Sequence, residues 1–207
     1  PVSNSAARRE QLQSVIAHEL SHMGFGDWVT REWWDDLWLN EAFANWMGSK
    51  VMEQVYPETL SAAEQVDSVQ SAFSVDSLPS ARAMRRPVKT QAVLLQAADA
   101  LAYNKGESVL QMFEQWIGSE TFRQGVLAYL ETHAWGNARG QDLWNALTKA
   151  SNVNVSAAMA SFLDQPGVPL VTVTVRPGGK VSLSQTRYAF AGLPAPQKQL
   201  WRIPVTL

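Results

Sequence analysis

Two histidines and two glutamates near the start of the chain have the residue types and the spacing of a metal site. His18 and His22 lie four residues apart, so on a helix both imidazoles project from one face and can reach a single ion. Glu41 supplies a third ligand if a second helix runs back past the first, and two histidines with one glutamate form a catalytic zinc set. Glu19, next to His18, can then act as general base toward a water activated by the metal.

The alternative without a metal site is a surface helix whose histidines are four residues apart by chance. The chain contains only three histidines, and two of them lie in this pattern, which favours the metal site. His133 is far from the pattern in sequence and is expected in the last turn of another helix. The sequence therefore predicts one Zn²⁺ ion with His18, His22 and Glu41 as its ligands.

Two helices must position these ligands. The first is predicted over residues 6–24, with Ser5 as its N-cap. Its apolar side is expected to consist of residues at helical spacing, namely Leu12, Val15, Ile16, Leu20 and Met23. The second is predicted from about residue 33 to residue 56, where Pro57 stops it.

The rest of the chain is predicted to be helical first and β-rich last. Further helices are expected at residues 59–73, 104–117, 119–133, 140–151 and 155–164. Residues 74–98 are predicted to form an extended loop with a short helix at its end. Strands with a turn at 177–179 are expected at residues 170–175, 180–187 and 201–207. The fold class is therefore mainly α, with a boundary between residues 1–165 and 166–207.

Composition agrees with a globular enzyme. Apolar residues make up 46% of the 207 residues and charged residues 17%, so disorder is not expected. The net charge of −2 gives no reason to invoke nucleic acid, and no stretch of about 20 apolar residues suggests a membrane span. The absence of cysteine excludes disulfides and thiol catalysis. Compartment and oligomeric state stay open, because a chain that starts at Pro1 without methionine need not show its targeting signals.

The metal pattern and three later segments together resemble a known family. The pattern is His-Glu-x-x-His, eighteen residues (23–40), and then Glu41. The later segments are residues 86–88 (Arg-Pro-Val), 103–106 (Tyr-Asn-Lys-Gly) and 122–144. Over most of residues 6–207 the chain resembles the zinc aminopeptidases of the alanyl/leucyl aminopeptidase type, a gluzincin family that also contains leukotriene A4 hydrolase.

The resemblance implies a fold and a set of roles. Residues 1–165 would be the helical, C-terminal lobe of a thermolysin-like zinc peptidase domain, and residues 166–207 the first strands of a small β-sandwich. Glu19 would be the catalytic base, and Tyr103 would donate a hydrogen bond to the oxyanion of the tetrahedral intermediate. Without the resemblance, Tyr103 would be read as an aromatic residue that packs on the core at a helix entry. The implied substrate is a peptide with a free N-terminus.

The chain also departs from the family pattern. Gly24, Ala42 and Gly48 replace residues that are usual in the family, but none of them is a ligand. The family's exopeptidase motif, Gly-x-Met-Glu-Asn, does not occur in the sequence, and its glutamate binds the α-amine of the substrate. The chain is therefore expected to be a fragment that binds zinc but has little or no aminopeptidase activity by itself, with a preferred N-terminal residue that the sequence does not reveal.

Three alternatives stay open for the whole protein. A thermolysin-like endopeptidase would share the zinc ligands and would cleave a peptide whose N-terminus is blocked. An epoxide hydrolase of the leukotriene A4 type would turn over an epoxide. A non-catalytic scaffold would tolerate loss of the ligands or of the base, and all four of these residues are present.

Two further groups of residues are expected to be structural. Most of the five tryptophans between residues 28 and 46 are assigned to the core, namely Trp28, Trp33, Trp34, Trp38 and Trp46. Asp35 and Asp36 suit the dipole at the start of a helix as well as they suit a second shell around the metal. A solvated loop is the expected place for the basic residues Arg82, Arg85, Arg86 and Lys89.

Overall fold

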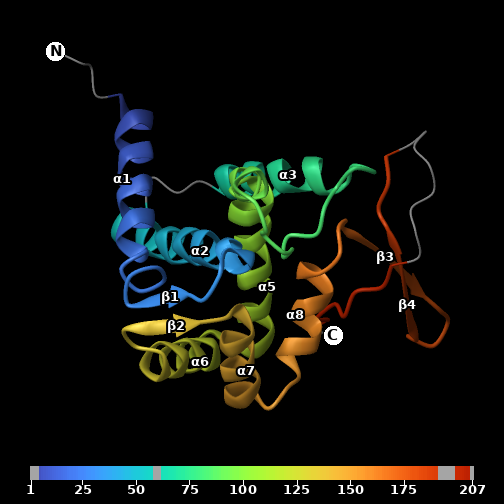
Figure 1. Cartoon of the computed structure of the whole chain (residues 1–207). Coiled ribbons are helices and arrows are strands. Elements are labelled where there is room, and N and C mark those ends of the chain that lie inside the picture. The colour runs from blue at the N-terminus through green and yellow to red at the C-terminus, as the bar shows by residue number, and fades with distance from the viewer. Residues whose placement is uncertain (1–4, 58–61, 191–198, 206–207) are drawn as a thin grey trace.

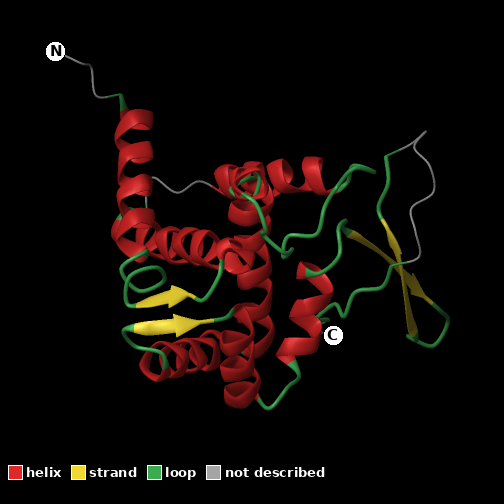
Figure 2. Cartoon of the chain, viewed as in Figure 1, coloured by secondary structure: helices red, strands yellow, loops and turns green. Residues whose placement is uncertain are grey.

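The chain is mainly α-helical in a computed structural model that describes residues 5–57, 62–190 and 199–205 (Figures 1 and 2). Its first half contains α1 (Ala6–Ser21), β1 (Val29–Arg31), the short 3₁₀-helix η1 (Trp34–Asp36), α2 (Leu37–Val55), α3 (Ala62–Asp76) and α4 (Gln91–Leu95). Its second half contains the π-helical turn η2 (Leu101–Lys105), α5 (Gly106–Ile117), α6 (Ser119–Thr132), β2 (Gly136–Ala138), α7 (Gly140–Ser151), α8 (Val155–Leu163), β3 (Pro169–Val175) and β4 (Val181–Arg187).

Helix α2 lies at the centre of the helical part and contacts α1, η2 and α5. Its sequence is apolar on most sides, and accordingly Trp38, Phe43, Trp46 and Met52 are buried. The indole of Trp38 stacks on that of Trp144 from α7, with ring centroids 5.4 Å apart. Because burial of large aromatic side chains dominates core energetics, this packing fixes the helix that carries residue 41.

Helix α1 begins where the sequence predicts but presents its apolar side differently. The Ser5 hydroxyl accepts a hydrogen bond from the Arg8 amide at 3.3 Å, as expected of an N-cap. The predicted apolar side is exposed, with Leu12, Val15, Ile16, Leu20 and Met23 each 48–62% exposed. Helix α1 instead meets α2 through Ala17, its one buried residue in the described part of the chain.

A two-stranded parallel sheet, which the sequence analysis missed, connects the loop after α1 to the loop before α7. Val29 pairs with Gly136 and Arg31 with Ala138, and the pair lies between α2 and α6 (Figure 2). The Trp135 amide extends the ladder by donating to the Trp28 carbonyl at 2.7 Å. The sheet holds the loop that follows the predicted metal-binding helix.

A buried ion pair connects α3 with the turn η2. The Lys105 ammonium lies 2.7 Å from Asp76, whose side chain is 1% exposed. Asp76 also accepts a hydrogen bond from the Gly167 amide at 2.8 Å. These contacts join three segments that are far apart in the sequence.

Strands β3 and β4 form an antiparallel hairpin in register from Pro169–Arg187 to Val175–Val181, with the predicted turn between them. The strand predicted at 201–207 is wrong for residues 201–205, and 206–207 lie outside the described residues. Instead, Trp201 is buried and exchanges two backbone hydrogen bonds with the side chain of Gln185. The domain boundary after residue 165 stays a prediction.

Most of the other predicted elements are present. Helices α5 to α8 agree with the predicted ranges within a few residues, and α4 is the short helix expected near the end of the 74–98 loop. The predicted third helix extends three residues further than expected, to Asp76, and its first residues, 59–61, lie outside the described part. In the described ranges, no helix combines the length and the apolar character that a membrane span requires.

One of the structural assignments is confirmed and one needs correction. Most of the five tryptophans belong to the core as predicted, since Trp28, Trp38 and Trp46 pack in or against it, whereas Trp33 and Trp34 are 59% and 38% exposed. The basic loop is not simply solvated. Arg85 makes two hydrogen bonds of 2.7 Å to Asp164, and Arg82 lies 2.6 Å from Asp99.

Candidate metal centre

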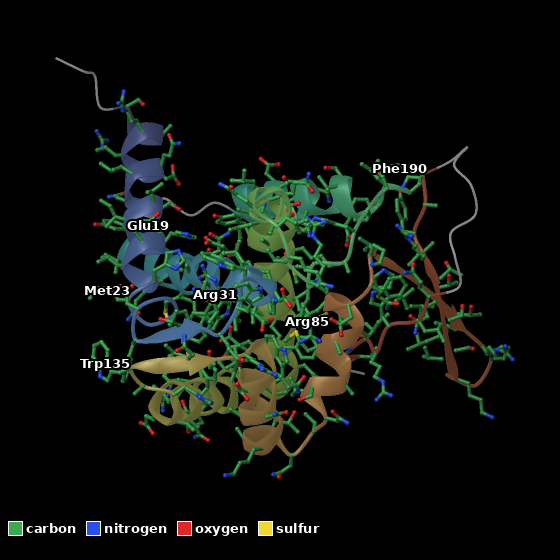
Figure 3. The ribbon with its side chains drawn as sticks, viewed as in Figure 1. Glu19, Met23, Arg31, Arg85, Trp135 and Phe190 are labelled. Carbon is green, nitrogen blue, oxygen red and sulfur yellow. The ribbon has the colours of Figure 1, made fainter. Side chains whose placement is uncertain are left out.

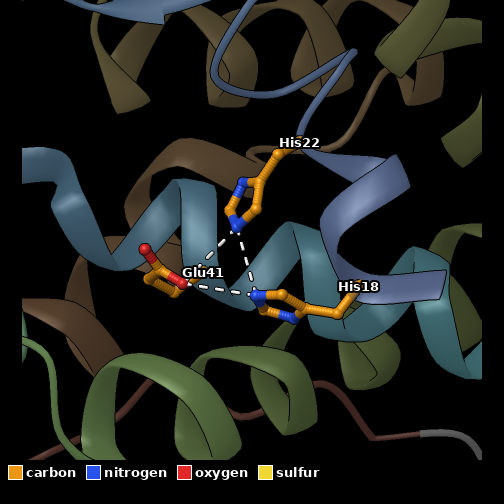
Figure 4. Close-up of side chains that lie close together, drawn as sticks. All are labelled: His18, His22 and Glu41. Carbon is orange, nitrogen blue, oxygen red and sulfur yellow. Dashed lines mark hydrogen bonds and ion pairs between the residues drawn. The ribbon is translucent and has the colours of Figure 1, made fainter. Parts of the chain in front are cut away.

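His18 and His22 direct their imidazoles toward the same point from one face of the end of α1. Their Nε2 atoms lie 3.1 Å apart (Figure 4). Nitrogens at this distance repel each other through their lone pairs unless a proton or a cation lies between them. The four-residue spacing on a helix therefore produces the geometry that the sequence analysis expects of a metal site.

Glu41 reaches the same point from α2. Its Oε2 atom lies 3.5 Å from the His18 Nε2 atom and 3.6 Å from the His22 Nε2 atom (Figure 4). Gly48 allows this approach of the two helices, because a Cβ atom at that position would be only 3.2 Å from the His18 amide nitrogen. A glycine on α2, two turns after the glutamate, therefore sets the distance between α1 and the helix that carries Glu41.

The three ligand atoms fit one tetrahedral ion. Two atoms that are each about 2.0–2.1 Å from such an ion lie about 3.4 Å from each other. The observed separations of 3.1, 3.5 and 3.6 Å bracket that value. Among the described residues, this is the one group of three or more histidine, cysteine or acidic side chains with ligand atoms this close together.

The outer nitrogens of both imidazoles have acceptors. The His18 Nδ1 atom lies 2.8 Å from the Asn45 Oδ1 atom, and the His22 Nδ1 atom lies 3.1 Å from the Phe25 carbonyl oxygen. Since these oxygens can only accept, each Nδ1 atom carries the proton. Each Nε2 atom therefore directs its lone pair at the centre of the site, as metal binding requires.

The charges of the site stabilise the carboxylate form of Glu41. Burial alone would raise the pKa of Glu41, but the His18 and His22 imidazoles, when their Nε2 atoms carry a proton, and the Tyr103 hydroxyl outweigh it and hold that pKa well below its usual value. The hydrogen bond to Glu41 is also the main reason why the pKa of His22 is raised, with burial opposing it. An anionic residue 41 is the form that binds a cation.

Tyr103 borders the site from η2. Its ring stacks on that of His18, with centroids 5.9 Å apart and an interplanar angle of 27°, and its hydroxyl hydrogen bonds with Glu41. Burial, followed by the hydrogen bond to Glu41, raises the pKa of Tyr103 to about 12. The phenol therefore keeps its proton at neutral pH and can donate it in a hydrogen bond.

Glu19 lies on α1 between the two histidines and is exposed (Figure 3). Its negative charge contributes to the raised pKa values of both His22 and Tyr103, so it acts on the same site. The structure thus brings together all five predicted site residues, namely His18, Glu19, His22, Glu41 and Tyr103.

Other residues of the sequence analysis lie outside the site. His133 is the C-cap of α6, with its ring 5.3 Å from that of Tyr129, as expected. Asp35 accepts a hydrogen bond from the Val88 amide at 2.6 Å, and Asp36 accepts one from the Gly140 amide at 2.9 Å. Both aspartates therefore join η1 to later segments of the chain.

Asn45, which contacts His18, was not among the site residues predicted from the sequence. Asn45 follows Glu41 by four residues, so both lie on one face of α2, and this spacing could have revealed it. Asn45 and His18 also line a cleft of about 430 Å³ between α1, α2 and α5, together with Ser49 and Glu107. This cleft borders the outer side of the His18 imidazole.

Comparison with known proteins identifies relatives across the whole chain. Over 205 residues the chain is 38% identical to "Probable aminopeptidase 1" of Sulfurisphaera tokodaii, covering 99% of this chain and 26% of that protein. It is 36% identical over 206 residues to "Leucyl aminopeptidase" of Saccharolobus solfataricus, with coverage of 99% and 26%. It is 35% identical over 204 residues to "Aminopeptidase M1" of Arabidopsis thaliana, with coverage of 99% and 23%. The chain thus spans about a quarter of the length of these relatives.

The family model of the peptidase family M1 domain matches residues 1–162. This range includes both predicted metal-binding helices, the turn η2 and helices α5 to α7. The resemblance noted from the sequence is therefore confirmed, and so is the mainly α fold. The chain belongs to peptidase family M1.

Proposed function

We propose that the protein to which this chain belongs is a zinc aminopeptidase that removes N-terminal residues from peptides. The observation that carries the proposal is the convergence of His18, His22 and Glu41, whose ligand atoms all lie within 4.8 Å of one another. Membership of a peptidase family and relatives that are named aminopeptidases support it.

His18, His22 and Glu41 would hold one zinc ion, since two nitrogens and one carboxylate oxygen leave a fourth position free. When bound, the ion supplies Lewis-acid polarisation of a carbonyl and acidifies a water molecule to a pKa of about 7. The acceptors on both Nδ1 atoms keep the imidazoles in the metal-binding tautomer. The low pKa of Glu41 keeps this residue anionic across the neutral range.

Glu19 and Tyr103 would perform the proton transfer and the oxyanion stabilisation. Glu19 is exposed beside the site, where its carboxylate can accept a proton from the attacking water and pass it to the leaving amine. Tyr103 keeps its hydroxyl proton at neutral pH and would donate a hydrogen bond to the developing oxyanion. The two residues come from different elements, α1 and η2; the charge of Glu19 acts on His22, and the hydroxyl of Tyr103 acts on Glu41.

The substrate would be a peptide with a free N-terminus. In the family the amine is bound by the glutamate of Gly-x-Met-Glu-Asn, and these 207 residues contain no such motif. The chain by itself would therefore bind zinc and turn over an amino-acid arylamide slowly or not at all, whereas the whole protein would turn it over rapidly.

The test compares the chain with the whole protein on two substrates. With one equivalent of zinc, we expect the whole protein to hydrolyse a leucine or alanine arylamide and to leave an N-acetylated peptide intact. Cleavage of the blocked peptide would indicate an endopeptidase instead, and turnover of an epoxide alone would indicate an epoxide hydrolase. No turnover of any of these substrates by the zinc-loaded whole protein would contradict the proposal and favour a scaffold.

A further inference from the structure

We propose that Asn45 and Glu107 form a chain of hydrogen bonds that holds His18 in its metal-binding tautomer, with Asn45 as the positioning residue. The inference rests on the proposed zinc site and extends it to residues outside the five assigned from the sequence. Neither residue touches the reacting atoms. Both would act on the affinity for zinc through the orientation and the proton position of one imidazole.

The first step is the contact between His18 and Asn45. The His18 Nδ1 atom and the Asn45 Oδ1 atom lie 2.8 Å apart and are partly buried between α1 and α2. An amide oxygen can only accept, so this contact requires a proton on Nδ1 and leaves the Nε2 lone pair for the ion. If the amide turned by 180°, its NH₂ group would face Nδ1 and favour the wrong tautomer.

The second step is the contact that prevents this rotation. The Glu107 carboxylate, which comes from α5, lines the same cleft as Asn45, and the Asn45 side chain is one of the groups that lower the pKa of Glu107 against the effect of burial. A carboxylate only accepts, so it selects the amide NH₂ group, and the amide oxygen must then face His18. The hydrogen bonds would therefore donate from His18 to Asn45 and from Asn45 to Glu107, and Glu107 would fix the orientation of the Asn45 amide.

The third step is the support of Glu107 itself. Its Oε1 atom accepts a hydrogen bond from the Ser49 hydroxyl at 2.7 Å and one from the Gln111 amide at 3.3 Å. Ser49 follows Asn45 by four residues on α2, and Gln111 follows Glu107 by four residues on α5, so each pair lies on one helix face. The packing of α2 against α5 thus places the carboxylate beside Asn45.

His22 offers an internal comparison. Its Nδ1 atom faces the Phe25 carbonyl oxygen at 3.1 Å, an acceptor that belongs to the backbone and cannot rotate as an amide side chain does. The two imidazoles are therefore held by different devices. Changes at residues 45 and 107 should alter the tautomer of His18 and leave that of His22 as it is.

The experiment measures the dissociation constant for zinc of this chain by competition with a chromophoric chelator. Asn45→Leu removes the acceptor at nearly constant volume and is expected to raise the dissociation constant about 10–100-fold, the usual effect of losing a partner of a metal-binding histidine. Glu107→Gln is expected to weaken zinc binding, because a neutral amide no longer selects the orientation of Asn45. The effect should be smaller than that of Asn45→Leu, because the Asn45 amide oxygen can still face His18. The matched control is Glu114→Gln, which changes another α5 carboxylate that bonds to α2 and should leave the dissociation constant unchanged.

A combined variant separates this role from a merely structural one. In the double variant Asn45→Asp with Glu107→Gln, the new carboxylate at position 45 faces His18. Both of its oxygens accept, so its rotation does not affect the His18 tautomer, and the new amide at position 107 can donate to it. We expect the pair to bind zinc more tightly than Glu107→Gln alone, whereas two independent packing defects would add. Long-range ¹H–¹⁵N NMR of the imidazoles should show the Nδ1–H form of His18 in the parent and a mixture in Asn45→Leu.

The outcomes separate the inference from the proposed function. If the parent chain does not bind zinc, or if His18→Ala binds it equally well, the proposed metal site fails and the inference fails with it. If the parent binds zinc through His18 but Asn45→Leu binds it equally tightly, or keeps the parent's His18 tautomer, the inference alone is overturned.

Discussion

Gly106 lies directly against Ala42. A Cβ atom added at position 106 would be only 2.5 Å from the Cβ atom of Ala42, so this contact leaves no room for a side chain at position 106. This contact lets the start of α5 approach α2 one residue after Glu41. Tyr103, which precedes Gly106 by three residues, reaches the Glu41 carboxylate for this reason. A small residue on each helix therefore decides how closely the predicted oxyanion donor approaches the predicted ligand.

Gly106→Ala is expected to lower the free energy of unfolding by about 1–3 kcal/mol, the usual cost of an extra carbon in a well-packed contact. Urea denaturation of the chain measures this change. The control is Gly24→Ala, where the nearest atom to the added carbon would be 3.7 Å away, an ordinary contact. Equal stability of Gly106→Ala and the parent would show that the helices can move apart freely.

The buried pair of Asp76 and Lys105 should be essential for folding. Asp76→Asn leaves a buried ammonium without its counter-ion and is expected to cost about 3–5 kcal/mol, a large part of the stability of a typical domain. Replacing both residues, Asp76→Asn with Lys105→Met, should cost less than the sum of the two single changes. Denaturant titrations test this, and strict additivity would contradict it. Arg123→Ala, at an exposed pair with Glu120, is the control and should change stability little.

Catalysis and metal binding should separate cleanly in the whole protein. Glu19→Gln and Tyr103→Phe keep all three predicted ligands, so both variants should bind one zinc ion. Tyr103→Phe is expected to lower kcat about 10²–10³-fold because an oxyanion donor is lost. Glu19→Gln should lower it at least as strongly because the base is lost. Arylamide kinetics and metal analysis of the same samples check this, and wild-type kcat in either variant would refute the assigned role.

Glu107 should also affect the pH dependence of stability. Burial raises the pKa of Glu107 above its ordinary value of 4.5, so the folded state binds more protons than the unfolded state just above pH 4.5. Its contribution to stability therefore falls as the pH rises through that window. The stability of Glu107→Gln relative to the parent should accordingly increase with pH from about 4.5, in urea titrations with a chelator present. Ser49→Ala removes a hydrogen bond that lowers the pKa of Glu107, so the pH range over which stability falls should become wider. A difference in stability between Glu107→Gln and the parent that does not change with pH would contradict the account.

The sequence predicted most helices and the converging ligands, for identifiable reasons. Helices α5 to α8 have apolar residues at helical spacing, and α5 and α7 end at a glycine and an asparagine, so local signals suffice. His18 and His22 needed only a helix, and Glu41 needed only a crossing of two predicted helices. Tyr103 lies 62 residues after Glu41, and only the family resemblance, not the spacing, pointed to it.

The missed features depend on contacts between distant segments. Strands β1 and β2 have three residues each and pair across more than 100 residues, so neither shows a periodic pattern. The spacing of apolar residues identified the apolar side of α1. It could not predict that this side is exposed among the described residues and does not pack on α2. The four-residue spacing from Glu41 could have pointed to Asn45, whereas Glu107 could be found only once the packing of α2 against α5 was known. Apart from the crossing of the two helices that carry the predicted ligands, contacts between distant elements could thus not be predicted from local sequence signals.

The most direct test of the central claim is zinc binding by this chain, measured by calorimetry together with X-ray absorption at the zinc edge. We expect one ion per chain, with nitrogen and oxygen ligands at about 2.0–2.2 Å. His18→Ala and Glu41→Ala should each abolish tight binding, while His133→Ala should bind as the parent does. Zinc binding that survives the loss of His18 or Glu41, or that requires His133, would contradict the account.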